Sequence, residues 1–397
     1  MRILVAAVLI TLASVGGAAA SIPSGLSDDP LDRGALLALP SVYRVDAVLH
    51  VDGLRTASGE RIALPAPLRT IRESGTAVAV AQDGWLVTAA HVAAPDDRTL
   101  ARLAYQQWLA AREQPHADDV AEAWVETEGA VPVGGRVESV SVRPAQVEPS
   151  PMHVPVFDAT MDVRRSSTAD LALLHIGARG APALELDEAA SAGTPIATIG
   201  FGRGSTLDGE RPGPLEPAIR RGVIRRTGLL GPEDDPAAQR KAIVISAPVE
   251  RGDSGGPVVD AQGHLRGIVT IKTETGGIAE RATEVRQLLE SNGLEPSAGV
   301  AADSFREGMQ ALWRLDLPAA ESGFDATLAA YPRHALAERE RSRTQELEQS
   351  SFALSGAHRL RGGLLAVAVI ALAAALACAL ALLRPSQGRA RGGAGGR

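Results

Sequence analysis

The chain has 397 residues, a formal net charge of −7 and a single cysteine. One cysteine cannot form a disulfide within the chain, so a small disulfide-stapled scaffold is excluded. Hydrophobic residues make up 45% of the chain, which argues against a disordered protein. Acidic residues outnumber basic ones by 47 to 40, so the chain has no net attraction for phosphates and no nucleic-acid partner is expected. This length allows two or three domains.

The first 20 residues carry the pattern of a secretory signal peptide. Arg2 precedes an apolar run over residues 3–15, and small residues at 18–20 form an A-x-A cleavage site before Ser21. The apolar run is short for a membrane-spanning helix, so an N-terminal anchor is the weaker interpretation. Residues 21–40 are polar and interrupted by proline and glycine, and we expect them to form a loose leader.

Short apolar segments separated by turn residues dominate residues 41–295. Strands are predicted at residues 42–45, 47–51, 76–81, 85–88, 137–142, 154–163, 171–176, 196–199, 222–225, 243–246, 257–259 and 267–271. Many short strands with turns between them predict a mainly β protein, an antiparallel barrel or sandwich, rather than alternating strands and helices. A helix with apolar residues over 285–289 on one face, ended by Gly293, closes this region.

Three motifs suited to a serine nucleophile follow one another along the chain. Thr-Ala-Ala-His ends a predicted strand at His91, Asp170 directly precedes an apolar strand, and Gly-Asp-Ser-Gly-Gly-Pro surrounds Ser254. A serine hydroxyl is a weak nucleophile at neutral pH and needs a histidine to accept its proton and a carboxylate to orient that imidazole. We therefore predict His91 as general base and then acid, Asp170 as its orienting group and Ser254 as nucleophile. Asp158 and Asp162 are alternative candidates for the orienting acid, but the place of Asp170 directly before a strand favours Asp170.

Backbone donors for the developing negative charge are predicted in the serine motif. Glycines before and after Ser254 allow the tight turn that aims successive N–H groups at one point. We assign this oxyanion hole to the N–H groups of Gly252 and Ser254. Histidine, cysteine and acidic residues nowhere show metal-ligand spacing, so no metal and no other cofactor is expected.

The motifs in this order resemble a trypsin-fold serine protease, and their surroundings are closest to the bacterial HtrA-type (Deg) branch. Gly-Thr-Ala-Val-Ala-Val at 75–80, Ile-Gly-Phe-Gly at 199–202, Arg-Gly-Val-Ile at 221–224 and Gly-Ile-Val-Thr at 267–270 are similar to the motifs of that branch. The resemblance covers residues 41–295. It implies two antiparallel six-stranded β-barrels with the three catalytic residues in the cleft between them.

The resemblance also indicates where the substrate binds. Pro248 and Val249 are expected near the floor of the specificity pocket, and Thr270, Ile271 and Lys272 along one wall. No carboxylate occupies the floor position, so an arginine or lysine before the scissile bond would lack a partner. We expect cleavage after small or medium aliphatic residues.

The chain departs from that branch in three ways. No PDZ domain is visible, and no activation site precedes the barrels, so Asp253 is not expected to await a newly freed N-terminus. Residues 97–127 form an insertion with the pattern of two short helices. Because this insertion begins beside His91, it is either a lid or substrate-selecting wall, or decoration; the sequence leaves both open.

Residues 301–349 are predicted to be helical. Gly308, Ala320, Phe324 and Pro332 have the spacing of one tetratricopeptide repeat, with a break at Pro318. A single repeat buries little surface, so a helical stalk and a module that binds a protein partner remain equally open.

A membrane helix is predicted at residues 364–383, which contain no charged or strongly polar side chain and include the single cysteine. Such a helix crosses about 30 Å of hydrocarbon. Nine of these residues are alanine, so a buried core helix is the alternative. Residues 384–397 hold four arginines and no acid, as expected of a cytoplasmic tail.

Together these features predict a single-pass protein of the bacterial cell membrane. Its exported domain, in the periplasm or outside the cell, would be a serine endopeptidase acting on proteins or peptides through an acyl-enzyme. One alternative is a membrane-tethered, non-enzymatic scaffold or chaperone-like peptide binder built on a protease fold. Another is a regulatory protease whose helical segment docks a partner.

Overall fold

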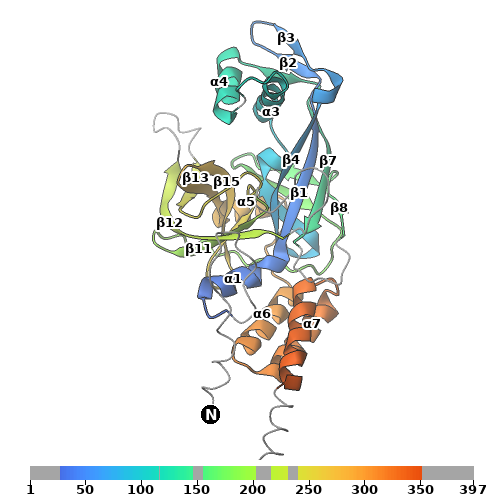
Figure 1. Cartoon of the computed structure of the whole chain (residues 1–397), viewed down its shortest axis with the longest axis vertical. Helices are drawn as coiled ribbons and strands as arrows, with labels where there is room; N and C mark the ends of the chain where they lie inside the picture. Colours follow the sequence, from blue (N-terminus) through green and yellow to red (C-terminus); the bar gives the residue numbers. More distant parts are fainter. Residues whose placement is uncertain (1–26, 116, 146–154, 203–215, 231–239, 351–397) are drawn as a thin grey trace, which may run out of the picture. The chain divides into compact units, whose positions relative to one another are not determined.

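The computed structural model covers residues 27–350, apart from residues 116, 146–154, 203–215 and 231–239 (Figure 1). The chain divides into two units, 1–342 and 343–397, and the description below concerns the first. The predicted signal peptide, membrane helix and basic tail lie outside the described residues. None of the helices in the described residues is both long and apolar enough to cross a bilayer.

The first half of the fold is a seven-stranded antiparallel sheet in the order β8-β7-β1-β4-β5-β10-β9. Its strands are β1 (Val42–His50), β4 (Thr70–Ala81), β5 (Trp85–Ala89), β7 (Arg136–Pro144), β8 (Phe157–Asp158), β9 (Val163–Arg165) and β10 (Leu171–His175). In β1 the alternate residues Val45, Ala47 and Leu49 are buried, while the residues between them are partly exposed, as the period of a strand requires. The sheet therefore has one face on the core.

The second half is a closed six-stranded barrel in the order β11-β12-β13-β16-β15-β14. The strands are β11 (Pro195–Gly200), β12 (Ala218–Leu230), β13 (Arg240–Ile245), β14 (Pro257–Val259), β15 (Leu265–Thr273) and β16 (Gly276–Arg281). The side chains that pack inside it are branched and fully buried: Ile196, Ile224, Ile243, Ile245, Val258 and Val269. Small branched side chains fill the narrow interior of such a barrel.

The expectation of two closed six-stranded barrels is correct for the second half and wrong for the first. The first sheet has seven strands and is open over the described residues. Its edge strands β8 and β9 span only two and three residues, so they offer few backbone groups for closing the sheet. The single strand predicted over 154–163 is also wrong, because a turn at Thr160, whose N–H donates to Asp158, separates β8 from β9.

The two predicted helices of the insertion are confirmed. They are α3 (Asp97–Ala110) and α4 (Asp118–Glu128), and Figure 1 shows them beside a small sheet that the sequence did not predict. That sheet contains β2 (Gly53–Arg55), β3 (Arg61–Ala63) and β6 (Val131–Val133), and α3 contacts β2 and β6. The Tyr105 ring stacks on Trp124 with centroids 3.7 Å apart, which fastens α3 to α4.

Residues 30–40, expected in a loose leader, are instead ordered. They form α1 (Pro30–Ala38) and a 3₁₀ turn at Leu39–Ser41, and α1 contacts β11 and β14. Asp29 begins the helix by accepting the N–H of Leu31 at 2.9 Å. Gly34 permits the close approach, because a Cβ there would lie 2.1 Å from the carbonyl oxygen of Asp260. The prediction of a loose leader is wrong for these residues because α1 has an apolar face that packs on the barrel.

Helices follow the barrel, as predicted. The helix around 285–289 is α5 (Ala282–Ser291), and Gly293 follows it with a φ of 70°. The helical segment contains α6 (Val300–Trp313) and α7 (Leu317–Ala330), with Pro318 in the first turn of α7, and residues 335–350 are helical. A Cβ on Gly323 would lie 2.6 Å from the Cα of Gly308, so α6 and α7 pack backbone to backbone.

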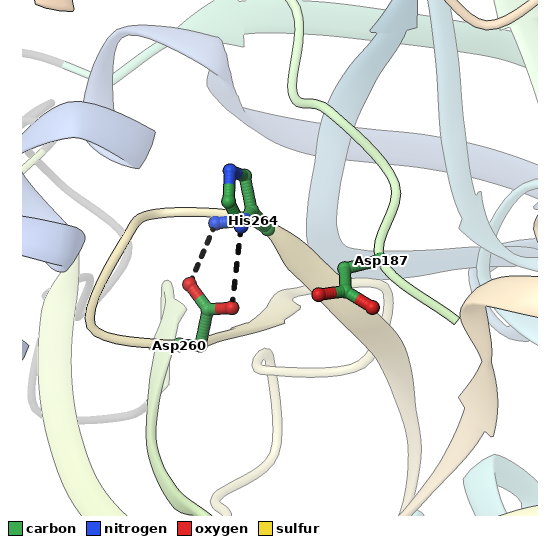
Figure 2. Close-up of side chains that lie close together, drawn as sticks. All are labelled: Asp187, Asp260 and His264. Atoms are coloured by element: carbon green, nitrogen blue, oxygen red, sulfur yellow. Dashed lines mark hydrogen bonds and ion pairs between the residues drawn. The ribbon is translucent and has the colours of Figure 1, made fainter. Parts of the chain in front are cut away.

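The turn between β14 and β15 holds a charged cluster (Figure 2). Asp260 is 2% exposed, and its Oδ1 accepts the backbone N–H groups of Gln262 at 2.8 Å and His264 at 3.0 Å. Its Oδ2 accepts Nε and Nη2 of Arg266 at 3.0 and 2.7 Å and lies 3.4 Å from His264 Nδ1. Burial alone would raise the pKa of Asp260, but the hydrogen bonds from His264 and Arg266 outweigh burial and hold this pKa well below its ordinary value.

This cluster predicts that the stability of the barrel depends on pH. The hydrogen bond to Asp260 raises the pKa of His264 above its ordinary value of 6.5. Protonated His264 therefore stabilises the fold: its contribution is complete below about pH 6.5 and is lost as the pH rises through the raised pKa. Urea unfolding from about pH 5.5 to about pH 8.5 should show the free energy of unfolding falling with pH, and His264→Gln should remove this fall.

His175 provides the control for this experiment, because it lies 3.3 Å from Asp162 at the surface rather than in a buried cluster. His175→Gln should leave the fall in unfolding free energy with pH intact. An equal fall in His264→Gln and the wild type would show that another group is responsible.

Candidate active site

The fold brings His91 and Asp170 into contact. His91 lies in α2 (Ala90–Ala93), directly after β5, and Asp170 directly precedes β10, which pairs with β5 through Leu171 and Ala89. The His91 N–H donates to Asp170 Oδ1 at 3.0 Å, and His91 Nδ1 lies 2.7 Å from Asp170 Oδ2. With Nδ1 protonated, the carboxylate fixes both the tautomer and the direction of the ring, which leaves Nε2 available as a base.

The two competing acids have other partners. Asp158 accepts the N–H of Thr160 at 2.9 Å, and Asp162 pairs with His175. Both lie on the short edge segments β8 and β9 or the turn between them. The geometry therefore favours Asp170 as the acid that orients His91.

The loop around Ser254 is held against β4 by Thr76. Thr76 Oγ1 donates to the carbonyl of Gly252 at 2.9 Å, and the Thr76 N–H donates to the carbonyl of Ser254 at 2.8 Å. In the described part of the chain, the N–H groups of Gly252 and Ser254 have no hydrogen-bond acceptor. N–H groups without an acceptor on either side of Asp253 are suited to the role of an oxyanion hole.

Glycine is required on both sides of Ser254. Gly252 has a φ of 102° and Gly255 a φ of 87°, a region that other residues rarely adopt. A Cβ would lie 2.3 Å from the carbonyl oxygen of Phe201 at Gly252, and 1.9 Å from that of Thr76 at Gly255. The glycines of the motif therefore set the turn that carries Ser254.

Asp253 has a partner within the chain. Its Oδ2 accepts Nη1 of Arg220, on β12, at 2.8 Å, and the N–H of Glu250 at 2.8 Å. The Asp253 side chain is 3% exposed and that of Arg220 is 15% exposed. Burial raises the pKa of Asp253, and the charge of Arg220 opposes this rise. No local pattern predicts Arg220 as this partner, because it is 33 residues away along the chain.

One cavity of about 970 Å³ brings most of the predicted site residues together. Its lining includes the predicted residues His91, Asp170, Gly252, Ser254, Thr270, Ile271 and Lys272. Pro248 and Val249 are not part of its lining: Pro248 is exposed, and Val249 is 5% exposed within the core of the barrel. No hydrogen bond joins Ser254 to His91 over the residues described, although both line this cavity.

The insertion forms a wall of the same cavity. Thr99, Arg102, Leu103, Asp118, Asp119 and Glu122 line it from α3 and α4. Glu73 and Ser74 line it from β4, directly before the Gly-Thr-Ala-Val-Ala-Val motif, and Arg251 from the serine loop. The insertion therefore borders the site rather than decorating a remote surface. The sequence predicts the two helices of the insertion, but it does not predict that they border this cavity.

One group of side chains has the spacing of a metal site in the residues that the structure describes: Asp187, Asp260 and His264 (Figure 2). Arg266 donates to Asp260 and also contacts Asp187 Oδ1 at 2.8 Å. Because the Arg266 guanidinium pairs with both carboxylates and His264 lies beside Asp260, we interpret the group as an ion-pair network.

Comparisons with known proteins find relatives among the trypsin-like peptidases. Residues 75–268 match the family described as the trypsin-like peptidase domain. The serine proteases MT3772 and Rv3671c, from two strains of Mycobacterium tuberculosis, are each 31% identical to this chain over 153 residues. That stretch is 37% of this chain and 36% of each relative, so the chain spans about a third of the curated relatives it matches.

Similar solved structures include the active form of the Rv3671c protease from M. tuberculosis. It is 19% identical, with a TM-score of 0.42, over 72% of this chain and 97% of that chain. The HtrA-type protease AlgW with a tripeptide is 19% identical, with a TM-score of 0.40, over 68% of this chain and 65% of that chain. Residues 75–268, which match the trypsin-like peptidase domain, contain His91, Asp170 and Ser254.

Proposed function

We propose that this chain is a serine endopeptidase that hydrolyses peptide bonds through an acyl-enzyme. The observation that carries the proposal is the contact of His91 with Asp170 in the cavity that Ser254 also lines. A non-enzymatic scaffold would need neither this contact nor two unpartnered N–H groups beside a serine. The peptidase hypothesis accounts for both the contact and the unpartnered N–H groups.

The proposed reaction begins with attack of Ser254 Oγ on the scissile carbonyl, while His91 Nε2 accepts the hydroxyl proton. Asp170 stabilises the imidazolium that forms, and the N–H groups of Gly252 and Ser254 stabilise the oxyanion. His91 then donates its proton to the leaving amine, and an acyl group remains on Ser254. Water then attacks the acyl carbon while His91 accepts a proton from it. The ester bond to Ser254 Oγ breaks, the carboxylic acid product leaves, and His91 returns the proton to Ser254.

Substitutions in the three residues test this reaction. Ser254→Ala should reduce peptide hydrolysis to the background rate, because no acyl-enzyme can form. Asp170→Asn should keep the fold but lower kcat by about 10⁴-fold, because the amide favours the wrong tautomer of His91. Asp162→Asn is the matched control and should retain full activity, since Asp162 pairs with His175 at the surface. Hydrolysis that persists in folded Ser254→Ala would rule out the proposed nucleophile.

Arg220 is proposed to hold the serine loop in its active shape without a newly freed N-terminus. Arg220→Met leaves the buried charge of Asp253 unpaired, which should cost about 3–5 kcal/mol of unfolding free energy and lower kcat. Arg221→Met is the matched control: Arg221 is 47% exposed and pairs with Asp29, so its loss should cost at most about 1 kcal/mol. Urea unfolding and peptide hydrolysis measure both effects. Equal costs for the two variants would argue against the role of Arg220.

The residue before the scissile bond is proposed to be small or medium and aliphatic. Ile271 lines the cavity beside Thr270, and its side chain is apolar. A peptide library should therefore show cleavage after alanine, valine or leucine. Strong cleavage after arginine or lysine would contradict this preference.

Residues 364–383 are proposed to anchor the domain in the cell membrane, with the body exported and residues 384–397 in the cytoplasm. The uncharged run and the basic tail support this arrangement. The full chain expressed in bacteria should stay with the membranes in alkaline carbonate, and a chain ending at residue 362 should not. Release of the full chain would contradict the anchor.

A further inference from the structure

We propose that the wall formed by α3 and α4 selects substrates with a lysine or arginine side chain at a position other than the residue before the scissile bond. This inference rests on the proposed peptidase function and adds the class of substrate to it. It assigns a role to the insertion, which the catalytic chemistry itself does not use.

The wall is fixed in place beside the catalytic residues. Asp96 begins α3 by accepting the N–H of Thr99 at 2.9 Å, and its other oxygen pairs with Arg165 of β9 at 2.9 Å. The stacked rings of Tyr105 and Trp124 hold α4 on α3. A wall held at both its start and its middle can present side chains to a bound peptide in a constant geometry.

The cavity has an excess of negative charge. Its lining contains the carboxylates of Glu73, Asp118, Asp119, Glu122, Asp170 and Glu250, six in all, against the three cations Arg102, Arg251 and Lys272. Clefts lined mainly by one sign of charge concentrate the field between their low-dielectric walls and attract ligands of the opposite sign. A cationic peptide is therefore favoured over an anionic one.

Two of these carboxylates, Asp119 and Glu73, make no ion pair shorter than 3.8 Å in the described residues. Asp118 and Glu122 already accept Arg102, at 3.0 and 3.4 Å. Asp119 is exposed and has neither an ion pair nor a hydrogen bond in the part of the chain that the structure describes. Glu73 pairs with Arg251 at the long distance of 3.8 Å. A substrate ammonium or guanidinium would find its partners at these two groups.

Thr270 supplies a second, independent observation in the same cavity. Thr270 lies on β15 and is 4% exposed, and its Oγ1 has no hydrogen-bond partner in the described residues. An unsatisfied buried hydroxyl is costly, and a bound peptide can satisfy it. Thr270 and the wall of α3 and α4 line the same cavity, so a bound peptide can contact both.

Asp118 and Asp119 also lie in the first turn of α4, where negative charge stabilises the helix N-terminus. The test must separate this structural role from substrate recognition. Asp119→Asn removes the charge and retains a side chain suited to a helix start. Glu73→Gln removes the second charge. Glu128→Gln is the matched control, because Glu128 lies at the other end of α4 and is not part of the cavity lining.

The assay uses sets of peptides that are identical except at one position. That position holds lysine, glutamate or the uncharged norleucine, and a separate set is made for each position. At one position other than that before the scissile bond, wild-type kcat/KM should be at least about fivefold higher for lysine than for norleucine at low salt. Asp119→Asn and Glu73→Gln should each reduce this ratio by about threefold, and added salt should reduce it in the wild type. Glu128→Gln should leave the ratio unchanged.

The outcomes separate this inference from the proposed function. Cleavage of the norleucine peptides without a lysine preference at any position overturns the inference and leaves the peptidase standing. An equal ratio of kcat/KM for lysine over norleucine in the wild type and in folded Asp119→Asn also overturns the inference. Because Asp119 is exposed, its variant is sufficient for this test if Glu73→Gln fails to fold. Failure of the folded wild type to cleave any peptide overturns the proposed function, and the inference with it.

Discussion

The buried side chain and backbone of Thr76 join the two halves of the fold. Thr76 is fully buried, and its hydroxyl both donates to the carbonyl of Gly252 and accepts the N–H of Phe201. Its own carbonyl accepts Thr88 Oγ1 at 2.7 Å, and its N–H reaches the carbonyl of Ser254. The hydroxyl and the N–H of this one residue are thus committed to the seam between the sheet that carries His91 and the loop that carries Ser254, while its carbonyl stays bonded within the sheet. The catalytic arrangement depends on that seam, because its members come from different halves of the chain.

The same seam explains why the serine loop tolerates so little change. The turn uses left-handed glycines, and the charge of Asp253 is buried beneath it. These features are unfavourable by themselves, and Arg220 and Thr76 offset them from neighbouring strands. Strain of this kind persists only where the surrounding structure holds it, which is typical of catalytic loops. The insertion adds a further layer, since it is fastened to β9 and borders the cavity that this loop opens into.

Much of this arrangement could be predicted from the sequence because the relevant signals are local. The three motifs, most strands, the two helices of the insertion and the helix ended by Gly293 each depend on a short pattern of apolar, turn and glycine residues. The open form of the first sheet could not be predicted, because it depends on the lengths of the edge strands β8 and β9. The packing of α1 on the barrel was not predicted because the proline and glycine residues around it indicated a loose segment. One of these glycines, Gly34, permits the contact. Long-range partners such as Arg220 and Glu73 carry no local pattern at all.

The central claim is that the fold makes Ser254 a nucleophile, and covalent labelling tests it most directly. The folded protein would be treated with a fluorophosphonate, and the modified residue located by mass spectrometry of its peptides. We predict one phosphonyl group on Ser254, with no label in Ser254→Ala and a much slower reaction in His91→Ala. Absence of an adduct on the folded wild-type protein, or an adduct that survives in Ser254→Ala, would contradict the claim.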